Sequence, residues 1–97
     1  MALITLEEGK KRLSYEYEDN DTEISSMISS IEGYLYIATG KNWENIPNTE
    51  HGQKAKAVAK EYVKLKLFLD YYSAHTALDD ARLTSMIKQL QYFARLV

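Results

Sequence analysis

Residues that could carry out catalysis or hold a metal ion are few in this chain, and their spacings do not suit either task. His51 and His75 lie far apart and lack the His-x-x-x-His spacing that places two metal ligands on one face of a helix. There is no cysteine, which removes thiolate zinc ligation and any disulfide framework. The glycines do not form a phosphate-binding loop, because they are scattered at Gly9, Gly33, Gly40 and Gly52. We therefore expect no catalytic residue, cofactor or metal, and interpret both histidines as surface or capping groups.

An acidic cluster precedes one of the predicted helices and could attract a divalent cation. Its members are Glu16, Glu18, Asp19, Asp21 and Glu23. The cluster lacks the spaced Asp or Asn ligands, the turn glycine and the final glutamate of an EF-hand. Carboxylates at this position also stabilise the positive N-terminal end of the helix that follows. We therefore interpret the cluster as a solvated segment that caps the helix.

Three lysines could form a cationic surface. Lys56, Lys60 and Lys64 recur at every fourth position and so share one side of a predicted helix. Such a side can contact nucleic acid or an acidic partner, or it can simply face solvent, and Glu61 beside it weakens its field. Lys66 instead falls within the apolar side, where an unpaired charge would be costly. It must extend its ammonium to the edge, pair with a carboxylate or mark a subunit contact.

Aromatic and small residues supply candidates for a protein interface. The chain has eight tyrosines and one tryptophan, and aromatic side chains with a polar tip are enriched at interfaces. Tyr34, Tyr62 and Tyr72 fall on inner helical sides, which predicts that they belong to the core. The candidate subunit interface consists of the tyrosines outside those sides and of small residues that would allow a close backbone approach. These residues are Tyr15, Tyr17, Ser26, Ser30, Gly33, Tyr36, Tyr71 and Tyr92.

Helical periodicity recurs four times, whereas alternation typical of strands is confined to a short stretch near residues 14–18. This pattern predicts an all-α fold, a small bundle of four helices with short loops. We expect the helices at about residues 5–13, 21–39, 49–73 and 80–95, within a single domain spanning 1–97. The clearest inner side belongs to the second helix and contains Ile24, Met27, Ile28, Ile31, Tyr34, Leu35 and Ala38.

Local signals mark where several of these helices begin and end. Thr5 with Glu8 matches a capping box, and Gly40 is the left-handed residue expected after a helix. Asn20 or Asp21 should cap the second helix, and Asn48 or Thr49 the third. Gly9 interrupts the first helix at a cost of about 1 kcal/mol relative to alanine. We therefore expect that helix to be short and dependent on packing.

Composition and charge exclude several broad classes. The 97 residues are 45% hydrophobic and 27% charged, which is typical of one ordinary globular domain. The formal net charge of −2 gives no general attraction to phosphate backbones or anionic lipid. No basic region followed by an apolar core opens the sequence, and no apolar run reaches about 18 residues. We expect neither an export signal nor a membrane span, and an intracellular site of synthesis.

The order of these features resembles that of the small head-tail connector proteins of tailed bacteriophages, over nearly the whole chain. The first half matches in its capped opening helix, its acidic loop and the apolar spacing of its second helix. The second half matches in an Ala/Val-rich helix ending near Tyr71-Tyr72 and in its closing helix. The residues concerned are Leu3-Ile4-Thr5-Leu6-Glu7-Glu8, Leu13, Ile24-x-x-Met27-Ile28-x-x-Ile31-x-x-Tyr34-Leu35, Thr39-Gly40 and Ser85-Met86-Ile87-x-x-Leu90-x-x-Phe93-x-Arg95. The chain departs from the family at Gly9, where an apolar residue is usual, and in a shorter connection at 73–79.

The resemblance implies a helical subunit, without enzymatic activity, of a ring that docks on the portal and joins the DNA-filled head to the tail. Its partners would be copies of itself, the portal protein and a tail-completion or stopper protein, with DNA only passing through the lumen and no membrane. It would occupy the virion head-tail junction, and the host bacterial cytoplasm before assembly, as the product of a phage or prophage. The alternative is a small helical regulator or adaptor that binds nucleic acid or protein through Lys56, Lys60 and Lys64.

Overall fold

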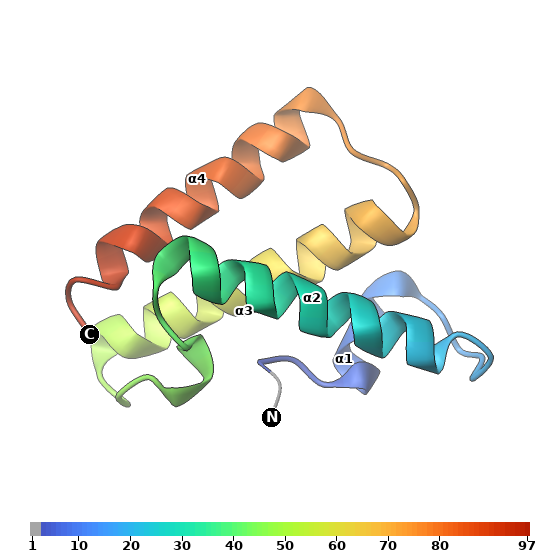
Figure 1. The fold of residues 1–97 in the computed structure, drawn as a ribbon, viewed down its shortest axis with the longest axis horizontal. Coiled ribbons are helices and arrows are strands. Elements are labelled where there is room, and N and C mark those ends of the chain that lie inside the picture. The colour runs from blue at the N-terminus through green and yellow to red at the C-terminus, as the bar shows by residue number, and fades with distance from the viewer. Residues whose placement is uncertain (1–2) are drawn as a thin grey trace.

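The computed structural model describes residues 3–97, so the first two residues of the predicted single domain lie outside it. Within the described part the chain forms four α-helices and no strand, which confirms the predicted all-α architecture (Figure 1). The elements are α1 (Leu6–Leu13), α2 (Asp21–Thr39), the short 3-10 helix η1 (Trp43–Asn45), α3 (Glu50–Tyr71) and α4 (Ala77–Phe93).

The predicted bounds of the first two helices agree with the structure, and those of the last two need correction. The third helix ends at Tyr71 rather than near 73, and Ser73 then takes a left-handed conformation with φ of 49°. The fourth helix runs from Ala77 to Phe93 rather than over 80–95. It begins early because the Thr76 hydroxyl caps it, accepting a hydrogen bond of 3.1 Å from the Asp79 amide. The sequence signal for this cap was missed.

The caps at α1 and α3 match the predictions. The Thr5 hydroxyl accepts from the Glu8 amide at 3.1 Å, and the Glu8 carboxylate accepts from the Thr5 amide at 3.0 Å. This backbone hydrogen bond, with a smaller contribution from the charge of Lys64, lowers the pKa of Glu8. Thr49 caps α3 by accepting from the Gly52 amide.

The cap of α2 differs from the prediction. Asn20 occupies the N-cap position, but its side chain makes no capping hydrogen bond. The side-chain nitrogen Nδ2 of Asn20 instead donates to the Tyr71 hydroxyl at 2.8 Å. This hydrogen bond joins the start of α2 to the end of α3. The hydrogen bond with Tyr71 therefore takes the place of a local capping hydrogen bond. Gly40 ends α2 as expected, with φ of 71°.

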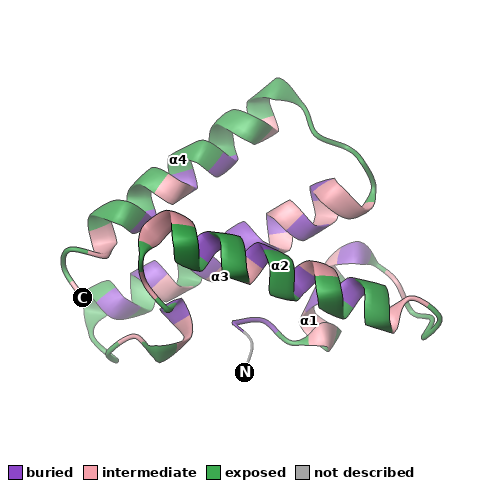
Figure 2. Ribbon diagram, viewed as in Figure 1, coloured by how far each residue is buried: buried purple, intermediate pink, exposed green. Residues whose placement is uncertain are grey.

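Helix α3 is the centre of the fold, because it packs against α1, α2, α4 and η1. Figure 2 shows buried positions along its length. Val63 and Leu67 of this helix are both fully buried. They lie beside Tyr62 and Leu65, so α3 is covered on more than one side. A single apolar side is therefore the wrong description of this helix, which is enclosed by its neighbours.

A carboxylate fixes the segment that precedes α1. The Leu3 amide donates to Glu32 of α2 at 3.0 Å, and the Ile4 amide donates to the same carboxylate at 3.2 Å. The side chains of Leu3 and Ile4 are both buried in the common core. The segment thus adds apolar area to the core while its backbone donors remain satisfied.

Gly9 is explained by close helix packing. A Cβ atom at this position would lie 2.8 Å from Cδ1 of Ile28 and 3.1 Å from Cδ2 of Leu67. Both neighbours are buried core residues with little freedom to move. The missing side chain lets α1 pack directly onto α2 and α3. Gly33 differs, because a Cβ atom there would meet nothing within 4 Å.

The same substitution should therefore have opposite effects at these two glycines. We expect Gly9→Leu to lower the free energy of unfolding by about 1–3 kcal/mol, the usual cost of an overfilled core. Gly33→Leu should raise it by several tenths of a kcal/mol to about 1 kcal/mol, because leucine favours a helix over glycine. Urea denaturation followed by circular dichroism measures both. Equal tolerance at the two positions would show that α1 does not pack as described.

Candidate protein interaction site

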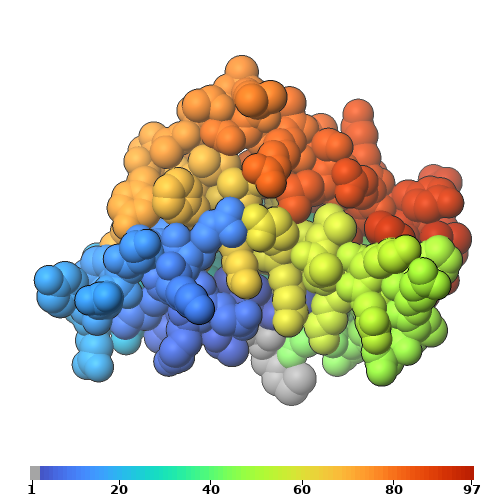
Figure 3. Space-filling view, turned by 180° about the vertical axis from the view of Figure 1, so that it is seen from behind, coloured from blue at the N-terminus to red at the C-terminus, as the bar shows by residue number. Residues whose placement is uncertain are grey.

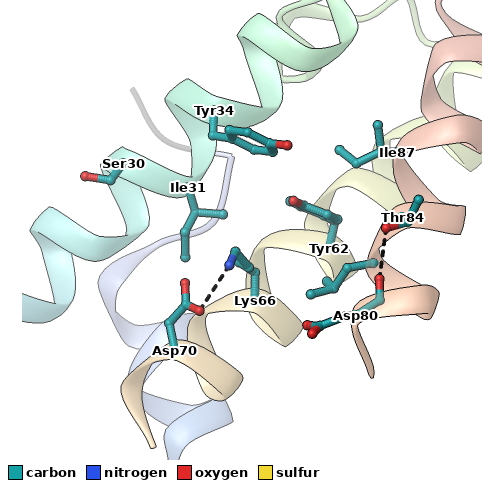
Figure 4. A pocket seen from close by; sticks show the side chains of 10 residues that line it. Ser30, Ile31, Tyr34, Tyr62, Lys66, Asp70, Asp80, Thr84 and Ile87 are labelled. Carbon is teal, nitrogen blue, oxygen red and sulfur yellow. Dashed lines mark hydrogen bonds and ion pairs between the residues drawn. The ribbon is translucent and has the colours of Figure 1, made fainter. Parts of the chain in front are cut away.

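A groove of about 520 Å³ lies between α2, α3 and α4. It opens where the N-terminal half of α4 stands away from α2 (Figure 1). Its apolar walls come from Ile31 and Tyr34 on α2, Tyr62 on α3, and Leu83 and Ile87 on α4 (Figure 4). We call this the α2–α4 groove. Mostly apolar walls with a few polar groups are typical of sites that bind other molecules.

Tyr62 places an unpartnered polar group in the groove. The residue is only 3% exposed, which confirms its predicted place in the core. Its hydroxyl lies in the space between α2 and α4 (Figure 4), and within residues 3–97 no hydrogen bond joins it to another group. Burial, with smaller contributions from Tyr34 and Asp70, raises the pKa of Tyr62 to about 12. The hydroxyl therefore keeps its proton and can donate a hydrogen bond to a bound molecule.

Charged residues form one end of the groove. Lys66 pairs with Asp70 one turn later, at 3.1 Å between Nζ and Oδ1, so the paired alternative for this lysine is the observed one. His75, in the connection between α3 and α4, bridges the two helices. Its Nε2 lies 2.5 Å from Oδ1 of Asp70, and its Nδ1 lies 2.7 Å from Oδ1 of Asp80. The two carboxylates raise the pKa of His75.

This bridge predicts a pH dependence of stability. Because the folded protein holds the His75 proton more tightly than the unfolded chain, the stabilisation is complete below the ordinary pKa of 6.5 and disappears as pH rises through the higher folded value. The free energy of unfolding should fall over that interval in the natural protein, and less steeply in His75→Gln. Asp80→Asn should lower the His75 pKa measured by NMR. An unchanged titration in Asp80→Asn would contradict the bridge.

The predicted small face borders the α2–α4 groove. Ser26, Ser30 and Gly33 are all exposed on α2, and Ser30 also lines the groove. Ile37 continues the same side of the helix and is 82% exposed. Sequence reasoning missed Ile37, although an isoleucine outside the apolar side of its helix was a detectable signal. These four residues form a ridge next to the groove, which we call the α2 ridge.

Two tyrosines predicted to be in the core are on the surface. Tyr34 is 56% exposed, because it lies at the edge of the buried side of α2, where α4 does not cover it. Tyr72 is 47% exposed and follows the last residue of α3. Its hydroxyl donates to the Leu13 carbonyl at 2.6 Å, so it joins α1 to α3 from outside the core.

The five outer tyrosines do not form one surface. Tyr17, Tyr36 and Tyr92 are exposed, but on three different elements. Tyr15 and Tyr71 are half-buried and pack edge-to-face, with ring centres 6.1 Å apart. Tyr15 also donates a hydrogen bond to Asp19, which raises its pKa to about 12. These two tyrosines hold the α1–α2 connection against the end of α3.

The lysine face is partly occupied by α1. Lys56, Lys60 and Lys64 are all half-buried, and Lys64 lies 3.6 Å from the Glu8 carboxylate. Arg12 of α1 pairs with Glu61 at 2.9 Å. Figure 3 shows the α1 segment lying directly against α3 on this side of the molecule. Acidic residues within the chain therefore neutralise part of the lysine face that the nucleic-acid alternative requires.

The described residues offer no arrangement of three or more histidine, aspartate or glutamate side chains that could hold a metal ion. Among the same residues, no helix has the length and apolar character needed to cross a membrane. Comparisons with protein-family models, curated proteins and solved structures found no match to this chain.

Proposed function

We propose that this chain is a structural subunit of a phage or prophage head-tail connector ring. The ring docks on the portal protein and joins the DNA-filled head to the tail, at the virion head-tail junction. The subunit is made in the host bacterial cytoplasm, contacts copies of itself and a tail-completion or stopper protein, and performs no catalysis.

The observation that carries this proposal is the position of the residues that resemble the family. Ile24, Ile28, Ile31 and Leu35 are buried on α2, and Leu90 is buried on α4. Most apolar positions of the pattern therefore lie in the contact surface of the four helices, whereas Tyr34 is exposed. Two exposed side chains, Tyr34 in the α2–α4 groove and Ile37 on the α2 ridge, are available for contact with other chains.

The charge of the molecule is compatible with a passage for DNA. Affinity for phosphate backbones comes mainly from lysine and arginine, and here the net charge is −2. A ring of such subunits would hold DNA weakly and let it move. Contacts between unlike surfaces can close into a ring when the rotation between subunits permits.

The proposal is tested by mixing the purified chain with rings of the portal protein from the same phage or prophage. Electron microscopy should show an added ring on the portal, and light scattering should show a heavier particle. Gly33→Trp should prevent ring formation yet keep the helical circular dichroism, because Gly33 lies on the exposed α2 ridge. A chain that stays monomeric and ignores the portal would rule out the connector role.

The regulator or adaptor alternative makes a separate prediction. Binding of DNA through Lys56, Lys60 and Lys64 should weaken steeply as salt rises and should be lost in the triple alanine variant. We expect no such binding, because Lys64 and the neighbouring Arg12 already face carboxylates. Fluorescence anisotropy with labelled duplex DNA at low salt measures it. A clear salt slope that the triple variant abolishes would favour this alternative.

A further inference from the structure

The side of α4 that faces away from the core is also partly apolar. Leu78, Ser85 and Tyr92 repeat every seven residues and so lie on one side of the helix, opposite the buried Leu83 and Leu90. Leu78 is 80% exposed and Tyr92 is 61% exposed. We call this side the outer face of α4. Neither Leu78 nor Tyr92 is therefore part of the core of its own molecule.

Charge is unevenly distributed along the sequence. Residues 81–97 contain Arg82, Lys88 and Arg95 but no aspartate or glutamate. No ion pair joins these three cations to a carboxylate within residues 3–97. Residues 14–40, which include α2, contain six carboxylates and no lysine or arginine. Beyond Asp79 and Asp80 in its first turn, α4 therefore carries only cations, which flank its outer face, whereas the charged residues of α2 are all anions.

The α2–α4 groove continues this acidic character at its charged end. A hollow of about 240 Å³ shares Ser30, Ile31 and Asp70 with the groove and is also lined by Glu23. Asp80 lies on the opposite wall of the groove. Lys66 and His75 offset only part of the negative charge here. An apolar cavity with acidic margins is complementary to an apolar helix side with basic margins.

We propose that the α2–α4 groove and the α2 ridge of one copy receive the outer face of α4 of a second copy. Leu78 and Tyr92 supply the apolar surface, while Arg82 and Lys88 meet the acidic margin. The α2 ridge lets the incoming helix come close, and the free Tyr62 hydroxyl donates one hydrogen bond to it. Two grooves would repel each other, and so would two outer faces, so the contact joins unlike surfaces.

A contact between unlike surfaces leaves one groove and one outer face free after every addition. The next copy can then bind in the same way, which produces a closed ring or an open filament according to the rotation per step. We assign this contact as the subunit interface of the connector ring. That assignment rests on the proposed function, whereas the contact itself does not.

Cysteine cross-linking tests the contact, because the natural chain has no cysteine to interfere. Ser30→Cys marks the groove side and Ser85→Cys marks the outer face. Under mild oxidation, a mixture of the two single variants should give covalent dimers, and the double variant should give a ladder of longer species. High salt should reduce both products several-fold, because the margins attract through charge. Ala57→Cys, on an exposed part of α3, replaces Ser30→Cys in the matched control and should give only background dimer.

Surface substitutions provide a second readout. In the cysteine mixture, Tyr34→Lys in the Ser30→Cys chain should abolish the dimer by placing a cation opposite Arg82 and Lys88. The pair Leu78→Glu and Tyr92→Glu should do the same in the Ser85→Cys chain. Cross-linking no stronger than in the Ala57→Cys control would overturn the proposed contact.

Portal binding by the same variants separates this contact from the proposed function. A chain that still forms a ring on the portal without the Ser30 to Ser85 cross-link would keep its connector role and lose this interface. A ladder in the absence of any portal binding would show the opposite, namely a self-association that serves another purpose.

Discussion

The enclosure of α3 is the constraint on which the rest of the structure depends. Val63 and Leu67 are fully buried, and Leu65 on the opposite side of this helix is buried as well. A helix with buried residues on several sides must be covered by more than one neighbour, and α1, α2, α4 and η1 all contact it. The small first helix can reach α3 only because Gly9 has no side chain to hold it away.

The surface features follow from how the neighbouring helices pack against α3. Helix α4 packs on α3 but diverges from α2, and the divergence leaves Tyr62 at the floor of a groove instead of beneath another helix. The groove is closed at one end by the ion pair of Lys66 with Asp70 and by the His75 bridge. A groove held in this way keeps its shape without a ligand, which reduces the ordering cost of binding a partner.

Several features were predictable from the sequence because their causes are local. Helix periodicity, the capping box at Thr5 and the left-handed Gly40 depend on residues a few positions apart. The missed cap at Thr76 had an equally local signal. The surface placement of Tyr34 and Tyr72 did not, since periodicity identifies a side of a helix without saying whether a neighbour covers it.

The sequence alone determined the all-α class, the positions of the helices to within a few residues, and the separation of acidic and basic segments, because each is a property of neighbouring residues in the chain. Only the tertiary structure decided which helix is enclosed, why Gly9 is required while Gly33 is open, and that Ser30, Tyr62 and Ile87 share one groove. Those facts depend on the angles at which helices cross, and crossing angles are set by the packing of side chains far apart in sequence.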